Sequence, residues 1–186
     1  MKIQMNQCIK LAAGLLGLSA VAENPAGELG GEDAADRDLL LKCVNLAAQQ
    51  TALKTSPPRA EETVTVEGQE LELGQLSKRA LEVIGVRDRQ GRPVTFTRLP
   101  YGVRLKGPGT FRVRYAFLPD DAALNGSLAF DEGRVHAELL GMGAAAEYCL
   151  ISGRFSEAAA WEEEFLSRLS AAGRRARLPR RAFAVS

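Results

Sequence analysis

The 186-residue sequence has one histidine, three cysteines and few aromatic residues, and these scarcities exclude several kinds of site. A metal site with several histidine ligands needs more than His136. Cys8, Cys43 and Cys149 lie far apart and include no C-x-x-C pair, so their spacing supports neither a zinc knuckle nor a thioredoxin-like site. Three cysteines cannot all pair within one chain, which favours a reducing compartment and thiols that act as small apolar core residues.

The chain also lacks a large net charge and a long apolar run. Its 24 Lys and Arg residues against 23 Asp and Glu residues leave a net charge of +1, which argues against a protein that binds nucleic acid over its whole surface. A membrane-spanning helix needs about 20 apolar residues, so we expect no membrane contact. With 46% hydrophobic residues, one sizeable core is expected, in one domain or in one domain with an insertion.

No motif of a catalytic or nucleotide site stands out. The sequence has neither a G-x-S-x-G nor a G-x-x-x-x-G-K-[ST] pattern. Residues 141–146 (GMGAAA) fit G-x-G-x-x-A, but a helical pattern precedes them in place of the strand that a dinucleotide site requires, so we interpret them as a site of close helix packing. The paired carboxylates, such as Asp120 and Asp121, lie in loops or in exposed patterns. We therefore predict no enzyme, no catalytic residue, no cofactor and no metal, and interpret His136 as a surface or packing residue of a helix.

Two interpretations of residues 1–22 are open. Lys2 and Lys10, the apolar residues 11–22 and an A-x-A motif at 20–22 resemble a secretory signal that is cleaved. The polar opening of the segment argues against a signal, and apolar residues recur at helical spacing from Ile9 onward, which favours a helix.

The period of the hydrophobic pattern changes twice along the chain. From Ala34 to about Lys54 it predicts an amphipathic helix, with Asp33 or Asp36 as its N-cap, so residues 1–58 are assigned to N-terminal helices. Between residues 61 and 119 an alternating pattern predicts five or six short strands separated by turns. The strongest of them, 111–117 (FRVRYAF), has one apolar face and one basic or small face. These strands are expected to form an inserted antiparallel sheet or barrel.

Residues 131–173 return to a helical pattern and are assigned to a C-terminal helix pair. Residues 131–152 make the first helix, with Gly153 as its C-terminal cap. Ser156 is expected to cap the second, with Phe155 as its staple residue. The residues expected to anchor the packing of this pair are Tyr148, Trp161, Phe165 and Leu169. The predicted fold class is thus α+β, with a helical bundle from the N- and C-terminal segments and an inserted small antiparallel β-sheet or barrel.

Charged residues are segregated along the chain. Residues 23–38 contain six acids and one base, whereas residues 174–186 contain five arginines and no acid. A basic tail of this kind either docks onto an acidic partner or nucleic acid, or is a solvated end. The residues singled out in this extended tail are Arg174, Arg175, Arg177, Arg180, Arg181 and Phe183.

A second set of basic residues falls in the predicted β unit, where it is placed as a stripe on one face. It consists of Arg98, Arg104, Lys106, Arg112 and Arg114. Such a stripe lines a channel or a subunit interface, or it is a solvent-exposed face. Few aromatic residues alternate with these arginines, although single-stranded nucleic acid binding uses such residues.

The alanine-rich segment 144–153 (AAAEYCLISG), followed by Phe155, Trp161 and Phe165, resembles the C-terminal helix pair of tailed-phage head–tail connector (adaptor) proteins. The strand that ends in 113–119 (VRYAFLP) is similar to the strand that leads into that pair. In order of elements the chain is similar to the tail tubular protein A group of connectors, which is helical with a β insertion.

The resemblance implies a structural virion protein of a phage or prophage, placed at the head–tail junction and assembled in the host cytoplasm. Such proteins form a homo-oligomeric ring, dodecameric in this family, that joins the portal protein to a downstream tail protein. DNA passes through the channel without sequence specificity. Portal docking uses a terminal extension, which points here to segment 174–186. The alternatives are a secreted or periplasmic non-catalytic binding domain with a cleaved leader, and a small regulatory nucleic-acid binder.

Overall fold

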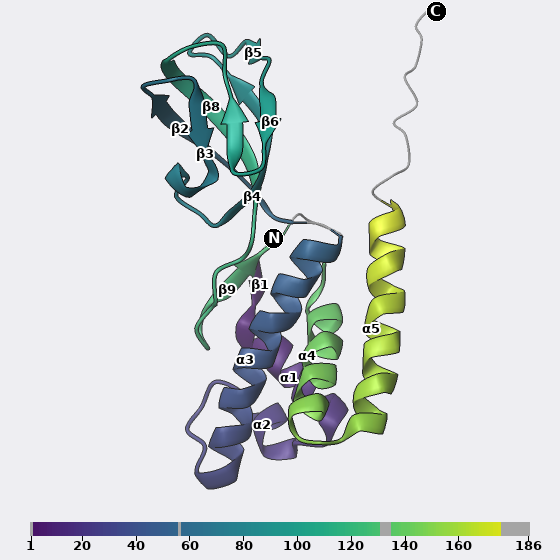
Figure 1. The fold of residues 1–186 in the computed structure, drawn as a ribbon. Coiled ribbons are helices and arrows are strands. Elements are labelled where there is room, and N and C mark those ends of the chain that lie inside the picture. The colour runs from purple at the N-terminus through teal and green to yellow at the C-terminus, as the bar shows by residue number, and fades with distance from the viewer. Residues whose placement is uncertain (1, 56, 131–134, 176–186) are drawn as a thin grey trace, which may run out of the picture.

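Helices from both ends of the chain pack together in the computed structural model, and a β unit projects from one end of the resulting bundle (Figure 1). The structure describes residues 2–55, 57–130 and 135–175, with side chains up to Ala172. The predicted α+β fold class with a small antiparallel β unit is confirmed.

The bundle is built around α4. Helices α1 (Met5–Leu16), α2 (Ser19–Glu23) and α3 (Gly31–Lys54) precede the β unit, and α4 (Ala137–Ile151) and α5 (Phe155–Arg175) follow it. Helix α4 packs against α1, α3 and α5, and ten of its fifteen residues are buried. A helix enclosed by three neighbours is apolar on nearly all sides, which explains why α4 has no polar face. Among the described residues, no helix has the length and apolar character needed to cross a membrane.

The first residues of the chain belong to this core. In α1, Cys8, Ile9 and Ala12 have no exposed surface. Strand β1 (Lys2–Gln4) pairs antiparallel with β9 (Ser127–Ala129), which ties the start of the chain to the segment that follows the β unit. The structure thus places residues 5–16 and 19–23 in helices.

The β unit has seven described strands in two antiparallel sheets and a core of its own. The strands are β2 (Arg59–Val66), β3 (Glu70–Glu72), β4 (Ala80–Arg87), β5 (Pro93–Val94), β6 (Thr97–Leu99), β7 (Gly102–Arg104) and β8 (Gly109–Phe117). One sheet has the order β2-β8-β4-β5 and the other β3-β7-β6. Leu71, Val103, Val113 and Tyr115 lie in the core of this unit, which is distinct from the core of the bundle.

Helix boundaries differ from the sequence predictions where capping was expected. Helix α3 begins at Gly31 after an extended Gly30, so neither Asp33 nor Asp36 is its N-cap. Asp33 instead lies in the first turn, where a negative charge favours the helix dipole. Helix α5 begins at Phe155, so Ser156 lies inside the helix and is not its N-cap. Phe155 is 67% exposed, so it does not act as the predicted hydrophobic staple.

The helix expected over residues 131–152 begins only at Ala137. His136 has an extended backbone, with φ −123°, and occupies the N-cap position, so the prediction of a helical His136 is wrong. At the other end, Gly153 adopts a left-handed φ of 76° directly after Ser152, as the predicted glycine cap requires.

Candidate functional site

The arginine-rich segment continues from the last turn of α5. Arg174 and Arg175 are the final residues of that helix, and their side chains are not described. Arg177, Arg180, Arg181 and Phe183 lie outside the described residues. Helix α5 ends at the same end of the bundle as the β unit, so the chain leaves the helix on that side (Figure 1).

Arg112 and Arg114 share the outer face of the four-stranded sheet. Both are exposed and alternate along β8 with buried Val113 and Tyr115. In the register with β2, Arg114 lies opposite Glu61, and the Arg112 Nε is 3.4 Å from the Glu61 Oε1. These two predicted residues therefore lie together on one solvent-facing surface.

Arg104 lies in the other sheet. Its Nε and Nη2 donate to the Glu70 Oε1 at 3.0 and 2.6 Å, and the Tyr101 hydroxyl donates to the Glu70 Oε2 at 2.8 Å. The hydrogen bonds from Arg104 and then Tyr101 hold the pKa of Glu70 below its ordinary value. The charge of Arg104 is thus matched by a carboxylate on a neighbouring strand.

Arg98 joins the two sheets, and Lys106 stands apart. Arg98, on β6, forms a 3.2 Å ion pair with Glu82 on β4. Lys106 is exposed in the connection between β7 and β8. The five predicted residues therefore come from two sheets and a loop, and the prediction of a single stripe on one face is wrong.

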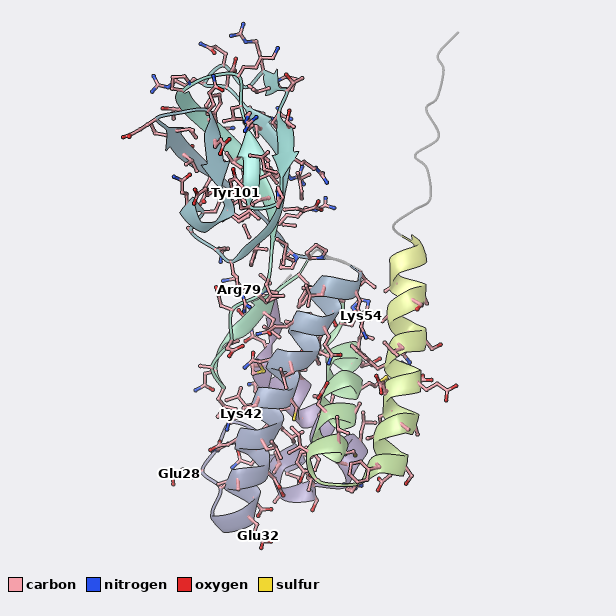
Figure 2. All side chains as sticks on the ribbon, viewed as in Figure 1. Glu28, Glu32, Lys42, Lys54, Arg79 and Tyr101 are labelled. Carbon is pink, nitrogen blue, oxygen red and sulfur yellow. The ribbon has the colours of Figure 1, made fainter. Side chains whose placement is uncertain are left out.

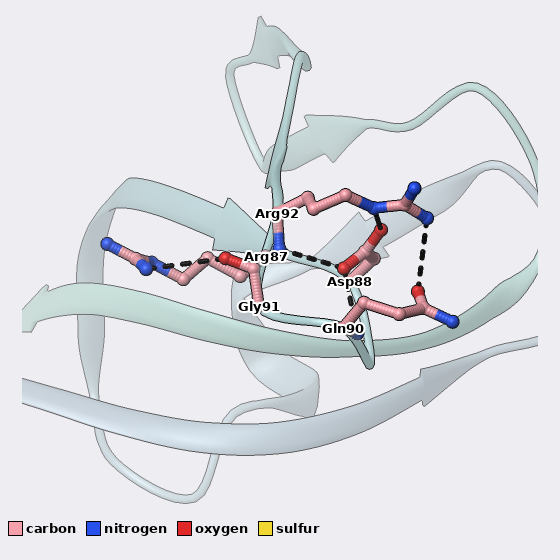
Figure 3. Close-up of polar contacts among 5 residues, drawn as sticks. All are labelled: Arg87, Asp88, Gln90, Gly91 and Arg92. Carbon is pink, nitrogen blue, oxygen red and sulfur yellow. Dashed lines mark hydrogen bonds and ion pairs between the residues drawn. The ribbon is translucent and has the colours of Figure 1, made fainter.

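The β4–β5 hairpin adds arginines that the sequence analysis missed. The carboxylate of Asp88 closes this turn by accepting hydrogen bonds from the backbone N–H groups of Gln90 and Arg92, both at 2.9 Å (Figure 3). The register of β4 with β8 places Arg87 directly opposite Arg112. The sequence signal that could have located Arg87 and Arg89 is the Asp-Arg-Gln-Gly turn motif at 88–91, because this turn determines where β4 ends.

The loop of this hairpin contributes another cation to the same sheet. The Arg89 Nη2 donates to the Thr110 Oγ1 at 2.8 Å, and Thr110 lies on β8 two residues before Arg112. We call Arg87, Arg89, Arg112 and Arg114 the basic sheet face. Of the five residues predicted as a stripe, only Arg112 and Arg114 belong to it.

The predicted packing anchors lie where the helices meet. Tyr148, Phe165 and Leu169 are buried, and Trp161 is half-buried against the same core. The Tyr148 hydroxyl donates to the Asp36 Oδ1 at 2.7 Å, and burial together with this bond raises the pKa of Tyr148 to about 12. This contact joins the end of α4 to the start of α3.

The glycines of residues 141–146 allow close approach of helices. A Cβ atom added at Gly143 would lie 2.9 Å from the Ala47 Cβ and 3.0 Å from the Phe165 Cε2. One added at Gly141 would lie 3.2 Å from the Leu11 Cβ. The interpretation of this segment as close helix packing is confirmed.

His136 is exposed and borders a shallow cavity with Ile3, Gln7, Leu11 and Glu138. Its position agrees with a surface residue. Within the described part of the chain, no group of three or more His, Cys, Asp or Glu side chains is placed to hold a metal ion.

The three cysteines are free and buried. Burial raises the pKa of Cys8 and of Cys43 to about 12, and burial also raises that of Cys149. The thiolate is the reactive form of cysteine, so raised pKa values and burial both oppose reaction.

We expect the folded protein not to react with the thiol reagent DTNB at pH 8, and to release three equivalents of thionitrobenzoate once unfolded in guanidinium chloride. Because the thiol pKa values are higher in the folded state, the unfolded state loses its thiol protons first as pH rises. The contribution of the buried thiols to the free energy of unfolding should therefore be constant below pH 9 and decrease between about pH 9 and 12. Urea titrations at several pH values measure this dependence. Rapid reaction in the folded state would contradict the burial of these thiols.

No protein-family model matches the chain, and a search of curated proteins gives no match.

Proposed function

We propose that this chain is a structural virion protein of a phage or prophage, which forms a ring between the portal and the tail. The order of its elements supports this proposal. Three helices, an inserted antiparallel β unit and a final helix pair follow one another as in the tail tubular protein A group that the sequence resembles. The proposed role includes no catalytic step.

One observation supports a position next to DNA: on the basic sheet face, two arginines lie opposite each other on neighbouring strands. Arg87 and Arg112 lie directly opposite each other in the β4–β8 register, and Arg114 follows on the same face. Cβ atoms of opposite residues are about 5 Å apart, and like charges there destabilise a sheet. Glu61 pairs with Arg112 and lies opposite Arg114, so this one carboxylate faces three arginines. A phosphate backbone passing this face would add negative charge without reading sequence.

In this proposal segment 174–186 docks to the portal. It follows α5, whose last residues lie at the end of the bundle that also carries the β unit (Figure 1). The residues proposed to bind the portal are Arg174, Arg175, Arg177, Arg180, Arg181 and Phe183.

Co-expression with the portal protein encoded in the same genome tests the assembly. We expect native mass spectrometry and electron microscopy to show rings that co-purify with the portal. Deletion of residues 174–186 should leave a folded chain that no longer co-purifies. Portal binding retained after this deletion would contradict the docking role, and a genome without a portal gene would contradict the proposal as a whole.

Arg87→Gln, Arg112→Gln and Arg114→Gln, combined, should weaken binding to duplex DNA at low salt. The slope of log K against log salt is negative, and each lost phosphate contact makes it shallower by about 0.9. Loss of three contacts should therefore reduce the magnitude of the slope by up to about 3. Fluorescence anisotropy over a salt series measures it. A matched control replaces three other arginines, Arg104, Arg154 and Arg168, which pair with Glu70, Glu157 and Glu164, by glutamine. Equal losses in both variants would show that net charge alone, and not this face, binds DNA.

A further inference from the structure

The turn between α4 and α5 exposes three large apolar side chains. Leu150, Ile151 and Phe155 are 52%, 55% and 67% exposed, and they surround the turn that Gly153 makes. Ten of the fifteen residues of α4 are buried, so Leu150 and Ile151 are exceptions in that helix. Phe155 is the first residue of α5. Apolar side chains grouped on a surface mark interaction sites. We call these three residues the apolar corner.

The end of the bundle that carries the apolar corner is acidic. Glu28 and Glu32 lie at the end remote from the β unit, where the α4–α5 turn also lies (Figures 1 and 2). Glu23, Glu28, Glu32 and Asp33 are all exposed. The hydrogen bond from Tyr148 to Asp36 joins the last turns of α4 to the first turns of α3, so the acidic start of α3 lies beside the end of α4 that carries Leu150 and Ile151.

We infer that the apolar corner binds segment 174–186 of a second copy of this chain. The two partners have complementary charge, because residues 23–38 sum to −5 and residues 174–186 to +5. They also match in polarity, since the apolar residues Phe183 and Val185 follow the last arginine of the basic segment. An apolar patch beside carboxylates suits such a segment.

To make this contact within one chain, the segment would have to run back along the whole length of α5. At about 1.5 Å per residue, α5 separates Phe155 from Arg175 by about 30 Å. Phe183 and Val185 follow Arg175 by eight and ten residues, which span at most about 29 and 36 Å when fully extended. A contact within one chain would therefore need a nearly fully extended segment, whereas a second copy can present the segment without this constraint.

A contact between opposite ends of two copies is heterologous, so it closes a ring or extends a filament. The inference goes beyond the connector proposal and does not depend on it. The contact belongs to the free protein: a portal that binds the same segment would displace the neighbouring copy.

Sedimentation velocity over a concentration series tests the contact with the full chain. We expect wild-type protein to self-associate at low salt and to dissociate as NaCl is raised. A tail variant, with Arg177→Glu, Arg180→Glu and Arg181→Glu, and a corner variant, with Leu150→Ser, Ile151→Ser and Phe155→Ser, should each remain monomeric. A matched control changes Leu46 and Leu53 to serine, since both are exposed on α3. This control should self-associate like the wild type.

Mixing the two monomeric variants gives the decisive result. The corner variant still has an intact segment and the tail variant an intact corner, so an equimolar mixture should form a 1:1 complex and nothing larger. Circular dichroism of each variant alone verifies folding. A wild-type protein that stays monomeric, a tail variant that still associates, or a mixture that gives no complex would each overturn the inference. Portal co-purification is a separate readout, so either proposal can fail alone.

Discussion

A chain that begins at residue 23 will not form the helical bundle. The deletion removes β1, α1 and α2 and with them eight buried apolar residues: Ile3, Met5, Cys8, Ile9, Ala12, Ala13, Leu16 and Val21. Full burial of one side chain the size of Ile or Met contributes about 1.5–3 kcal/mol, whereas a whole domain is stable by only about 5–15 kcal/mol. Thermal unfolding followed by circular dichroism at 222 nm should show no cooperative transition of the helices. The β unit has its own core and should keep its signal.

Two substitutions within α1 serve as a matched pair for this deletion. Ile9 has no exposed surface, so Ile9→Ala should lower the free energy of unfolding by about 2–5 kcal/mol. Leu15 is 38% exposed in the same helix, and Leu15→Ala should cost under about 1 kcal/mol. A truncated chain with a cooperative transition near the wild-type midpoint would contradict the structural role of α1. It would instead favour the interpretation of residues 1–22 as a cleaved leader, which the intact mass after expression would show.

The helix faces could be predicted because periodicity reports burial directly. On α5, the predicted anchors Phe165 and Leu169 are four residues apart, and both are buried in the core of the bundle. On α3, Leu40, Val44 and Thr51 have no exposed surface, as their spacing indicated. Helix ends were less predictable, since a backbone such as that of Gly30 begins α3 without any capping side chain.

Strand pairing could not be predicted from the sequence, and it determines which arginines lie together on the basic sheet face. The register places Arg87 against Arg112, and two irregularities between Ala80 and Gly85 shift that register. A shift of one residue turns every side chain to the opposite face, so no periodicity argument locates such a pair. The pairing of β1 with β9 was missed for a related reason: three-residue strands more than 120 positions apart leave no local pattern.

The segment that carries the connector resemblance also has a purely structural explanation. Ala144 and Ala145 have no exposed surface and Ala146 has 9%, because α4 lies between three other helices. Small residues are required wherever backbones approach this closely. The resemblance is therefore best tested through assembly, whereas substitutions in α4 test its packing.

Gly143→Val will be among the most damaging single substitutions in the bundle. A Cβ built at this position would lie 2.9 Å from the Ala47 Cβ, closer than Cβ atoms come in folded proteins, and 3.0 Å from the Phe165 ring, which is a tight contact. The two further methyl groups of valine force α3 or α5 away from α4. Overpacking a close-packed core typically costs about 1–3 kcal/mol, and we expect about 3 kcal/mol or more here. Urea titrations measure the free energy of unfolding.

Gly14 in α1 is the matched control, because a Cβ added there meets no atom within 4 Å. Gly14→Ala should raise the free energy of unfolding by about 0.4–1 kcal/mol, since alanine restricts the unfolded chain and favours a helix. Gly143→Ala should lower it despite the same gain in propensity. If both glycines responded alike, close packing of α4 against α3 and α5 would not be the reason for glycine at position 143.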